Sequence, residues 1–236
     1  MIVKFSARVP HAAVRLVIVS AAFCAVLAST TGVAAATTAP FVPAGYVSNL
    51  SGVASASLNL NLKVPTITCT ARTTAPVFDV ADLSGTGPGG TEVAGVTVTA
   101  SCSGLVPSYS VIAAVDNSTD SSVVAVAPGD VIGIALIAQG NFETASFAGN
   151  GFTGTFVDGV GFSPTGAAVD VQGGTGSGGF PRFTPTNFSA IKLDGKAFSK
   201  SSPTAQNQTS GTSTQISVNP LNLSGTGFTA KFLTNK

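Results

Sequence analysis

Apolar and polar residues alternate along much of the chain with the period of β-strands. The clearest case is residues 55–62, where Ser, Ala, Ser, Leu, Asn, Leu, Asn and Leu follow one another, a pattern typical of a strand with one buried face. Tyr109–Val115 and Val131–Ala138 are apolar almost throughout, and we expect both to be buried on their two faces. The other predicted strands are 93–100, 152–157, 167–172, 188–193, 215–218 and 227–233.

Turn-forming residues separate these segments, since the chain contains 27 Gly and 13 Pro. Pro128-Gly129-Asp130 predicts a tight turn. Ser84–Gly90, Gly173–Gly179 and Ser199–Ser213 are predicted as loops because Gly or small polar residues dominate them. No stretch has a helical period of useful length. The pattern therefore predicts an all-β fold, an antiparallel two-sheet β-sandwich.

Residues 1–36 are typical of a secretory signal peptide. Three basic residues precede the apolar run Leu16–Leu27, and Ala34–Ala36 supplies the small residues of a cleavage site before Thr37. A membrane anchor is the alternative, which the shortness of the apolar run disfavours. We expect a secreted, extracellular protein with a single β-sandwich domain at 37–236 and no membrane association after cleavage.

The composition excludes several kinds of chemistry. The single histidine, His11, lies in the leader, and the chain has no Trp. Without a histidine after removal of the leader, a Ser-His-Asp triad, a Cys-His dyad and a histidine metal site are excluded. We expect no metal or cofactor. Removing the leader's three basic residues leaves 8 Lys and Arg against 10 Asp and Glu, a net charge of about −2. No basic stripe is present, which argues against nucleic-acid binding.

Two cysteines, Cys69 and Cys102, remain after removal of the leader. In an oxidising compartment a disulfide is expected between them. Two free buried thiols are the alternative.

Several short motifs along the chain together resemble one enzyme family. In order they are Val64-Pro65 with Cys69, Glu92-Val93-Ala94-Gly95-Val96, Cys102-Ser103-Gly104, Pro107-Ser108-Tyr109 and Pro128-Gly129-Asp130. Their order and spacing resemble the glutamic peptidase (eqolisin-like) family, from about Gly45 to the C-terminus. The resemblance implies a lectin-like jelly roll of two curved sheets with a substrate groove on the concave side. It also implies a mechanism in which a Glu acts as acid and base on water and a Gln amide steadies the oxyanion.

The sequence departs from the family pattern at the positions that carry this chemistry. Val93 stands where the family has Gln in a Glu-Gln-x-Gly-Val pattern, and Ala168 stands where the family has the catalytic Glu. Ala114 lies in the strand where the family has a third carboxylate. We therefore predict a catalytically inactive binding or structural module. Phe78 falls where the family has a groove Trp, and Glu143 lies off the family position in a loop-like stretch.

Three polar residues are candidates for a groove. Asp82 falls where the family has a groove Asp. Residues 168, 170 and 172 share one face of a strand, so Asp170 and Gln172 would project beside Ala168 and could hydrogen-bond a glycan or a peptide backbone. The alternative is that both side chains lie on a solvated face. A second possible function is an active acid endopeptidase that uses Asp82 and Asp170 as a relocated carboxyl pair.

Overall fold

The alternation in the sequence is realised as strands in which every second side chain is buried. In β2 (Ser55–Lys63) the buried positions are Ala56, Leu58, Leu60 and Leu62, and the residues between them are half-buried or exposed. The computed structural model describes residues 43–115, 123–174, 179–210 and 212–234. The predicted signal peptide, 1–36, lies outside the described residues.

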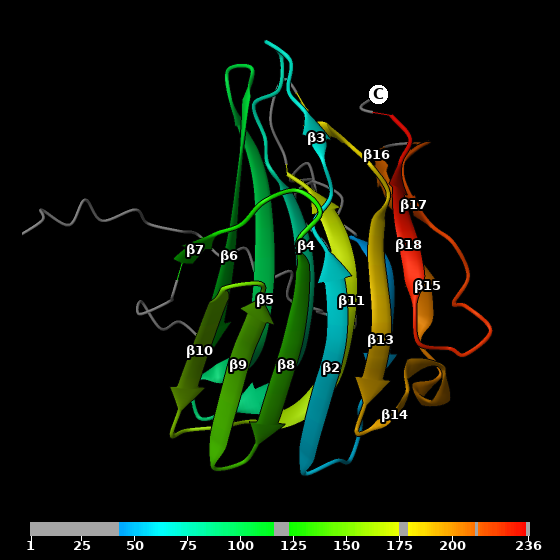
Figure 1. Ribbon diagram of the computed structural model, residues 1–236. Coiled ribbons are helices and arrows are strands. Elements are labelled where there is room, and N and C mark those ends of the chain that lie inside the picture. The colour runs from blue at the N-terminus through cyan, green and yellow to red at the C-terminus, as the bar shows by residue number, and fades with distance from the viewer. Residues whose placement is uncertain (1–42, 116–122, 175–178, 211, 235–236) are drawn as a thin grey trace, which may run out of the picture. The chain divides into compact units, whose positions relative to one another are not determined.

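The described strands form two large antiparallel sheets and one small one (Figure 1). Sheet A runs in the order β15 (Thr204–Gln206), β1 (Ala44–Asn49), β11 (Ser163–Gly173), β4 (Val77–Gly87), β5 (Gly90–Ser103), β6 (Val106–Val115) and β7 (Val123–Ala125). Sheet B runs in the order β10 (Phe152–Asp158), β9 (Phe142–Gly149), β8 (Val131–Gln139), β2, β13 (Thr186–Leu193), β18 (Phe228–Phe232), β17 (Ser213–Val218) and β16 (Gln208–Ser210), with β14 (Lys196–Ala197) beside β13. The small sheet pairs β3 (Ile67–Thr68) with β12 (Arg182–Phe183), and η1 (Phe198–Ser201) is a short 3-10 helix.

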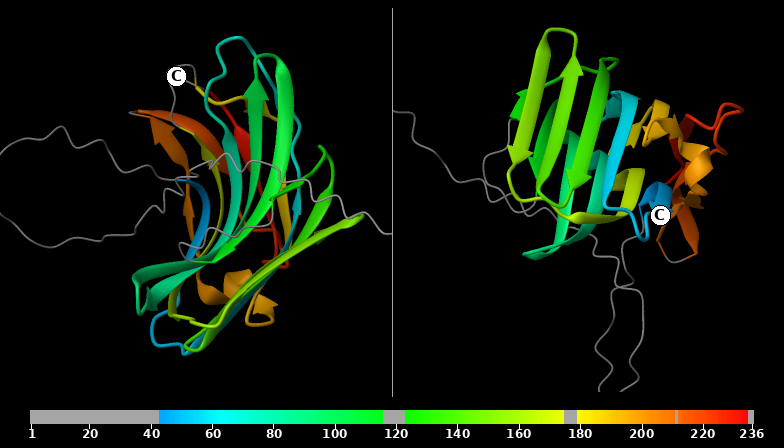
Figure 2. Two further views of the ribbon diagram at one scale, coloured as in Figure 1. Left: turned by 90° about the vertical axis from the view of Figure 1, so that its left-hand side faces the viewer. Right: turned by 90° about the horizontal axis from the view of Figure 1, so that it is seen from below.

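The two large sheets pack face to face as the layers of a sandwich (Figure 2). Aromatic residues join the layers where β1 meets β18. The ring of Phe228 lies 4.9 Å from that of Tyr46 and 4.8 Å from that of Phe188, measured between centroids. Tyr46 also donates a hydrogen bond from its hydroxyl to the Asn219 carbonyl at 3.0 Å. The predicted fold class, an antiparallel β-sandwich, is confirmed.

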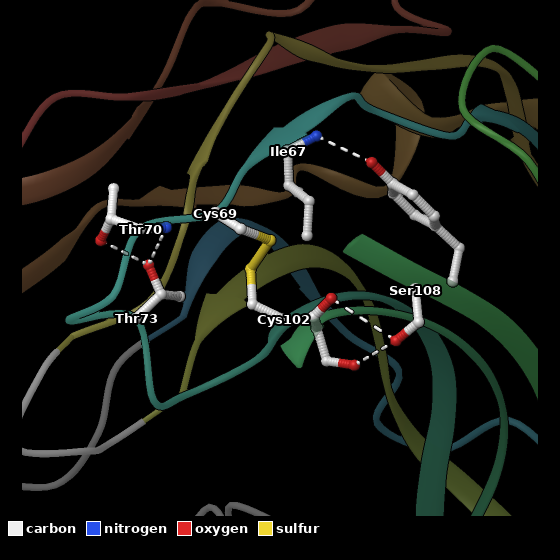
Figure 3. The surroundings of a disulfide bond; sticks show 8 residues. Ile67, Cys69, Thr70, Thr73, Cys102 and Ser108 are labelled. Carbon is white, nitrogen blue, oxygen red and sulfur yellow. Dashed lines mark hydrogen bonds between the residues drawn. A yellow bond between two sulfur atoms is a disulfide. The ribbon is translucent and has the colours of Figure 1, made fainter. Parts of the chain in front are cut away.

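The predicted disulfide is also confirmed. Cys69 and Cys102 are bonded, with their Cα atoms 5.7 Å apart, and they join the segment after β3 to the end of β5 (Figure 3). Next to the bond, the Ile67 amide donates to the Tyr109 hydroxyl at 2.9 Å. The small β3–β12 sheet is therefore held against the end of sheet A.

Three local expectations are wrong. Ser84–Gly90 is not a loop, because β4 continues to Gly87 and β5 begins at Gly90, which leaves a tight hairpin turn. Ser199–Ser213 contains the end of η1 together with β15 and β16. β6 and β8 are buried on one face only, since Ile137 and Val131 of β8 are 38% and 54% exposed.

The predicted turn at 128–130 is confirmed, and Gly129 takes the positive φ of 90° that the turn requires. Of the Gly173–Gly179 loop, residues 175–178 lie outside the described residues, and Gly173 ends β11.

Candidate functional site

The predicted site residues lie on the face of sheet A that points away from sheet B, which we call the outer face. Core positions of each strand are buried against sheet B, and the residues between them project to the outer face. The strand register places Ala168 opposite Asp82, Asp82 opposite Gly95, and Gly95 opposite Ala114. One row across four strands thus contains three of the predicted positions.

Val93 belongs to the same face. It lies opposite Ser84, which is two residues along β4 from Asp82. Val93 of β5 and Ala168 of β11 therefore lie on opposite sides of β4, and their partners on β4 are two residues apart. The structure brings together the positions at which the resemblance placed a catalytic pair, and both positions hold apolar side chains.

Asp170 and Gln172 extend this cluster along β11. The side-chain amide of Gln172 donates to Asp170 Oδ1 at 3.0 Å. Asp170 is two residues from Ala168 on the same face, so it is the diagonal neighbour of Asp82. Asp170 is only 2% exposed, and the expectation of a solvated face is wrong for this residue. Gln172 is half-buried.

The close packing around Asp170 depends on a glycine. Gly45 of β1 lies directly opposite Asp170. A Cβ atom at Gly45 would overlap the side chain of Asp170 and the carbonyl oxygen of Val169. The sequence predicted neither β1 nor this contact, because both depend on a partner strand more than a hundred residues away.

Burial changes the protonation of the two carboxyls. It raises the pKa of Asp82 from its ordinary value of 3.8 to about 7. The pKa of Asp170 is raised well above its ordinary value, first by burial and then by the charge of Asp82, while the hydrogen bond from Gln172 opposes the shift. Each carboxyl is therefore neutral at acidic pH, where it can both donate and accept a hydrogen bond.

A third aspartate, Asp79, was not predicted. It lies on the core face of β4, is 1% exposed, and accepts a hydrogen bond from the Thr186 hydroxyl of β13 at 3.2 Å. Its other oxygen, Oδ2, is buried without a hydrogen-bond partner among the described residues. Burial raises the pKa of Asp79 to about 7, and the bond from Thr186 lowers it. Recognising β4 would have revealed this position, because residues 79 and 82 of one strand must face opposite sides.

The two glutamates of the chain lie away from the outer face. Glu92 occupies a core position of β5, where Oε1 accepts from the Gly89 amide at 2.7 Å. Glu143 is fully buried in β9 of sheet B, so the expectation of a loop at Glu143 is wrong. The sequence contains no other glutamate, so none projects from the part of the outer face that the structure describes.

The described residues contain neither a cluster of metal ligands nor a membrane-crossing helix. Within 43–115, 123–174, 179–210 and 212–234, no three His, Cys, Asp or Glu side chains are grouped as metal ligands would be. In the same residues no helix has the length and apolar character needed to cross a membrane.

Comparison with known proteins gives a match in structure alone. No protein-family model matches the sequence, and no curated protein matches it. A solved scytalido-glutamic peptidase with a transition-state analogue inhibitor superposes with a TM-score of 0.63 at 13% identity, covering 82% of this chain and 98% of that one. SCP-B, a member of the eqolisin family of peptidases in a complex with the tripeptide Ala-Ile-His, superposes with a TM-score of 0.58 at 13% identity, covering 80% and 97%. The chain thus has the fold of the glutamic peptidases.

Proposed function

We propose that this chain is a secreted, catalytically inactive module that binds an uncharged polar ligand, a glycan or a peptide backbone, on the outer face of sheet A. Residues 1–36 would direct export, and the Cys69–Cys102 disulfide agrees with an oxidising compartment. The observation that carries the proposal is the cluster of Asp82, Asp170 and Gln172 beside the apolar positions Val93 and Ala168.

The side chains on this face are unsuited to turnover. An isopropyl group at Val93 cannot donate a hydrogen bond to an oxyanion, and a methyl group at Ala168 cannot transfer a proton. Removal of a single oxyanion donor costs on the order of a hundredfold to a thousandfold in rate. Loss of the acid-base group as well removes the carboxyl that would activate water at this position.

The polar groups that remain on this face are suited to binding. Protonated Asp82 offers both a donor and an acceptor, and Gln172 adds an amide whose orientation is fixed by its bond to buried Asp170. The residues on either side of Asp82 are small, since Gly95 has no side chain and Ala168 has only a methyl group. Neutral hydrogen-bonding groups suit the hydroxyls of a glycan or the amides of an extended peptide.

The test is a binding screen at pH 5 against glycan and peptide arrays. We expect a ligand whose affinity falls at least about tenfold in Asp170→Ala, because the carboxyl and the orientation of Gln172 are lost together. Asn59→Ala, which removes an exposed polar group from the outer side of sheet B, is the control and should bind as the wild type does. Equal binding by wild type and Asp170→Ala would refute the assignment of the site.

An active endopeptidase is the second candidate, favoured by the position of Asp82 and Asp170 on one face with their charges coupled. Such a pair needs one ionised carboxylate to activate water. With its pKa raised to about 7, Asp82 stays protonated between about pH 2 and pH 5, and burial raises the pKa of Asp170 as well. The raised pKa values therefore move any activity of this pair toward neutral pH and weigh against an acid peptidase.

A further inference from the structure

The four open edges of the two sheets differ in length. Within the described residues, sheet A ends at β15 and β7, and one end of sheet B is β16. Each of these three edge strands is three residues long. The fourth edge, β10, is seven residues long. Short edge strands are one of the means by which proteins prevent unwanted pairing, and β10 lacks this protection.

Of the other common protections β10 has one, a charged residue, Asp158, at its last position. The strand pairs with β9 in an unbroken register from Phe152 to Asp158, so it contains no bulge. It carries no Pro, Lys or Arg. Its side chains toward the outer side of sheet B are Thr153, Thr155 and Val157, all exposed, the last at 61%. Figure 1 shows β10 at the end of the sheet, and no described strand pairs with its free edge.

We propose that a second copy of this chain pairs with β10 edge to edge, antiparallel, about a twofold axis that passes between the two copies of Thr155. Every second residue of an edge strand directs its N–H and C=O away from its only neighbour, and antiparallel pairing would satisfy these groups in both copies. The result is one continuous sheet across two sandwiches, an isologous dimer. This inference is independent of the ligand proposed for sheet A.

The side chains of β10 favour a second copy over an unrelated strand because they complement themselves. With Thr155 opposite Thr155 of the second copy, Thr153 lies opposite Val157, and Gly154 lies opposite Phe156. Thr–Thr pairs and β-branched pairs stabilise neighbouring strands. Gly154 faces the core, where the ring of Phe147 on β9 already covers it. The complementarity therefore rests on the Thr and Val pairs of the outer side.

The test is sedimentation equilibrium of the purified protein and of charged variants. We expect wild type to have twice the monomer mass, and Thr155→Lys and Thr155→Glu each to raise the dimer dissociation constant at least about tenfold, because like charges meet across the axis. An equimolar mixture of the two variants should regain the dimer, since Lys then faces Glu.

Ala148→Lys is the matched control, exposed on the same side of the sheet but on β9, one strand from the edge, and it should remain dimeric. A monomeric wild type at the highest soluble concentration would overturn the proposal. So would a dimer that both Thr155 variants retain, or a mixture that stays monomeric. Circular dichroism of each variant separates dissociation from unfolding.

Discussion

At the scale of single residues, three aspartates on two adjacent strands make the free energy of unfolding depend on pH. Burial raises the pKa values of Asp79, Asp82 and Asp170. The native state therefore keeps protons that the unfolded chain releases near pH 4. Because the native state binds more protons between about pH 4 and pH 7, the free energy of unfolding falls as the pH rises through that range. For Asp79 and Asp82, whose native pKa values are about 7, the stabilisation is fully present below about pH 4 and is lost as the pH rises through about 7.

Asp79 tests this relation most simply, since it lies in the core and away from the proposed ligand. Asp79→Asn should unfold in urea at pH 5 with a free energy close to that of wild type, because both side chains are then neutral. At pH 8 the variant should be more stable by a few kcal/mol, because wild type must hold an ionised carboxylate in the core. Equal urea profiles for the two proteins at pH 8 would contradict the assignment.

Asp82 makes a related prediction for ligand binding. If its protonated carboxyl donates to the ligand, the affinity of the wild type should fall as the pH rises through about 7, where Asp82 ionises. Asp82→Asn keeps a donor at every pH, so its affinity should change less over the same range. Isothermal titration at pH 5, 7 and 8 gives the comparison, and parallel pH profiles for the two proteins would exclude Asp82 as a donor.

At the scale of elements, the disulfide fixes a small sheet that has little core of its own. β3 and β12 are two residues each, and Cys69 and Cys102 hold the segment after β3 to β5 across a separation of 33 residues. On the chain-entropy model a cross-link of this span stabilises the fold by about 4 kcal/mol.

A double Cys69→Ala, Cys102→Ala variant should therefore lose about 2–4 kcal/mol in guanidinium unfolding. Wild type with a reducing agent should approach the same value, which controls for the alanine side chains. A loss below about 1 kcal/mol in both cases would mean that the hydrogen bond from Ile67 to Tyr109 and the β3–β12 pairing hold the segment without the bond.

The elements that the sequence predicted are those whose own side chains alternate. β2 was evident because its Leu residues are spaced by two. β4 was missed because Asp, Gly and Ser interrupt its apolar positions, although it pairs along its whole length with β5 and β11. β15 and β16 were missed within a polar tract, because their pairing uses backbone groups that leave no mark in the composition.

At the scale of the whole molecule, the fold is shared with the glutamic peptidases without close sequence similarity. Superposition on scytalido-glutamic peptidase covers most of both chains at 13% identity. A sandwich core requires only that apolar side chains recur at alternate positions, a condition that many sequences meet. The grouping of Val93, Ala168 and Ala114 around Asp82 followed from motif order in the sequence. The burial of Asp170, Asp79 and Glu143 did not, since it depends on which strands meet across the sandwich.

The central claim is that the outer face of sheet A binds without cutting. Its most direct test is incubation of the purified protein with a denatured protein substrate from about pH 2 to pH 8, with peptide products followed by mass spectrometry. We predict no cleavage above that of Asp82→Asn and Asp170→Asn at any pH. Cleavage by wild type that either substitution abolishes would contradict the claim and identify the two carboxyls as a catalytic pair.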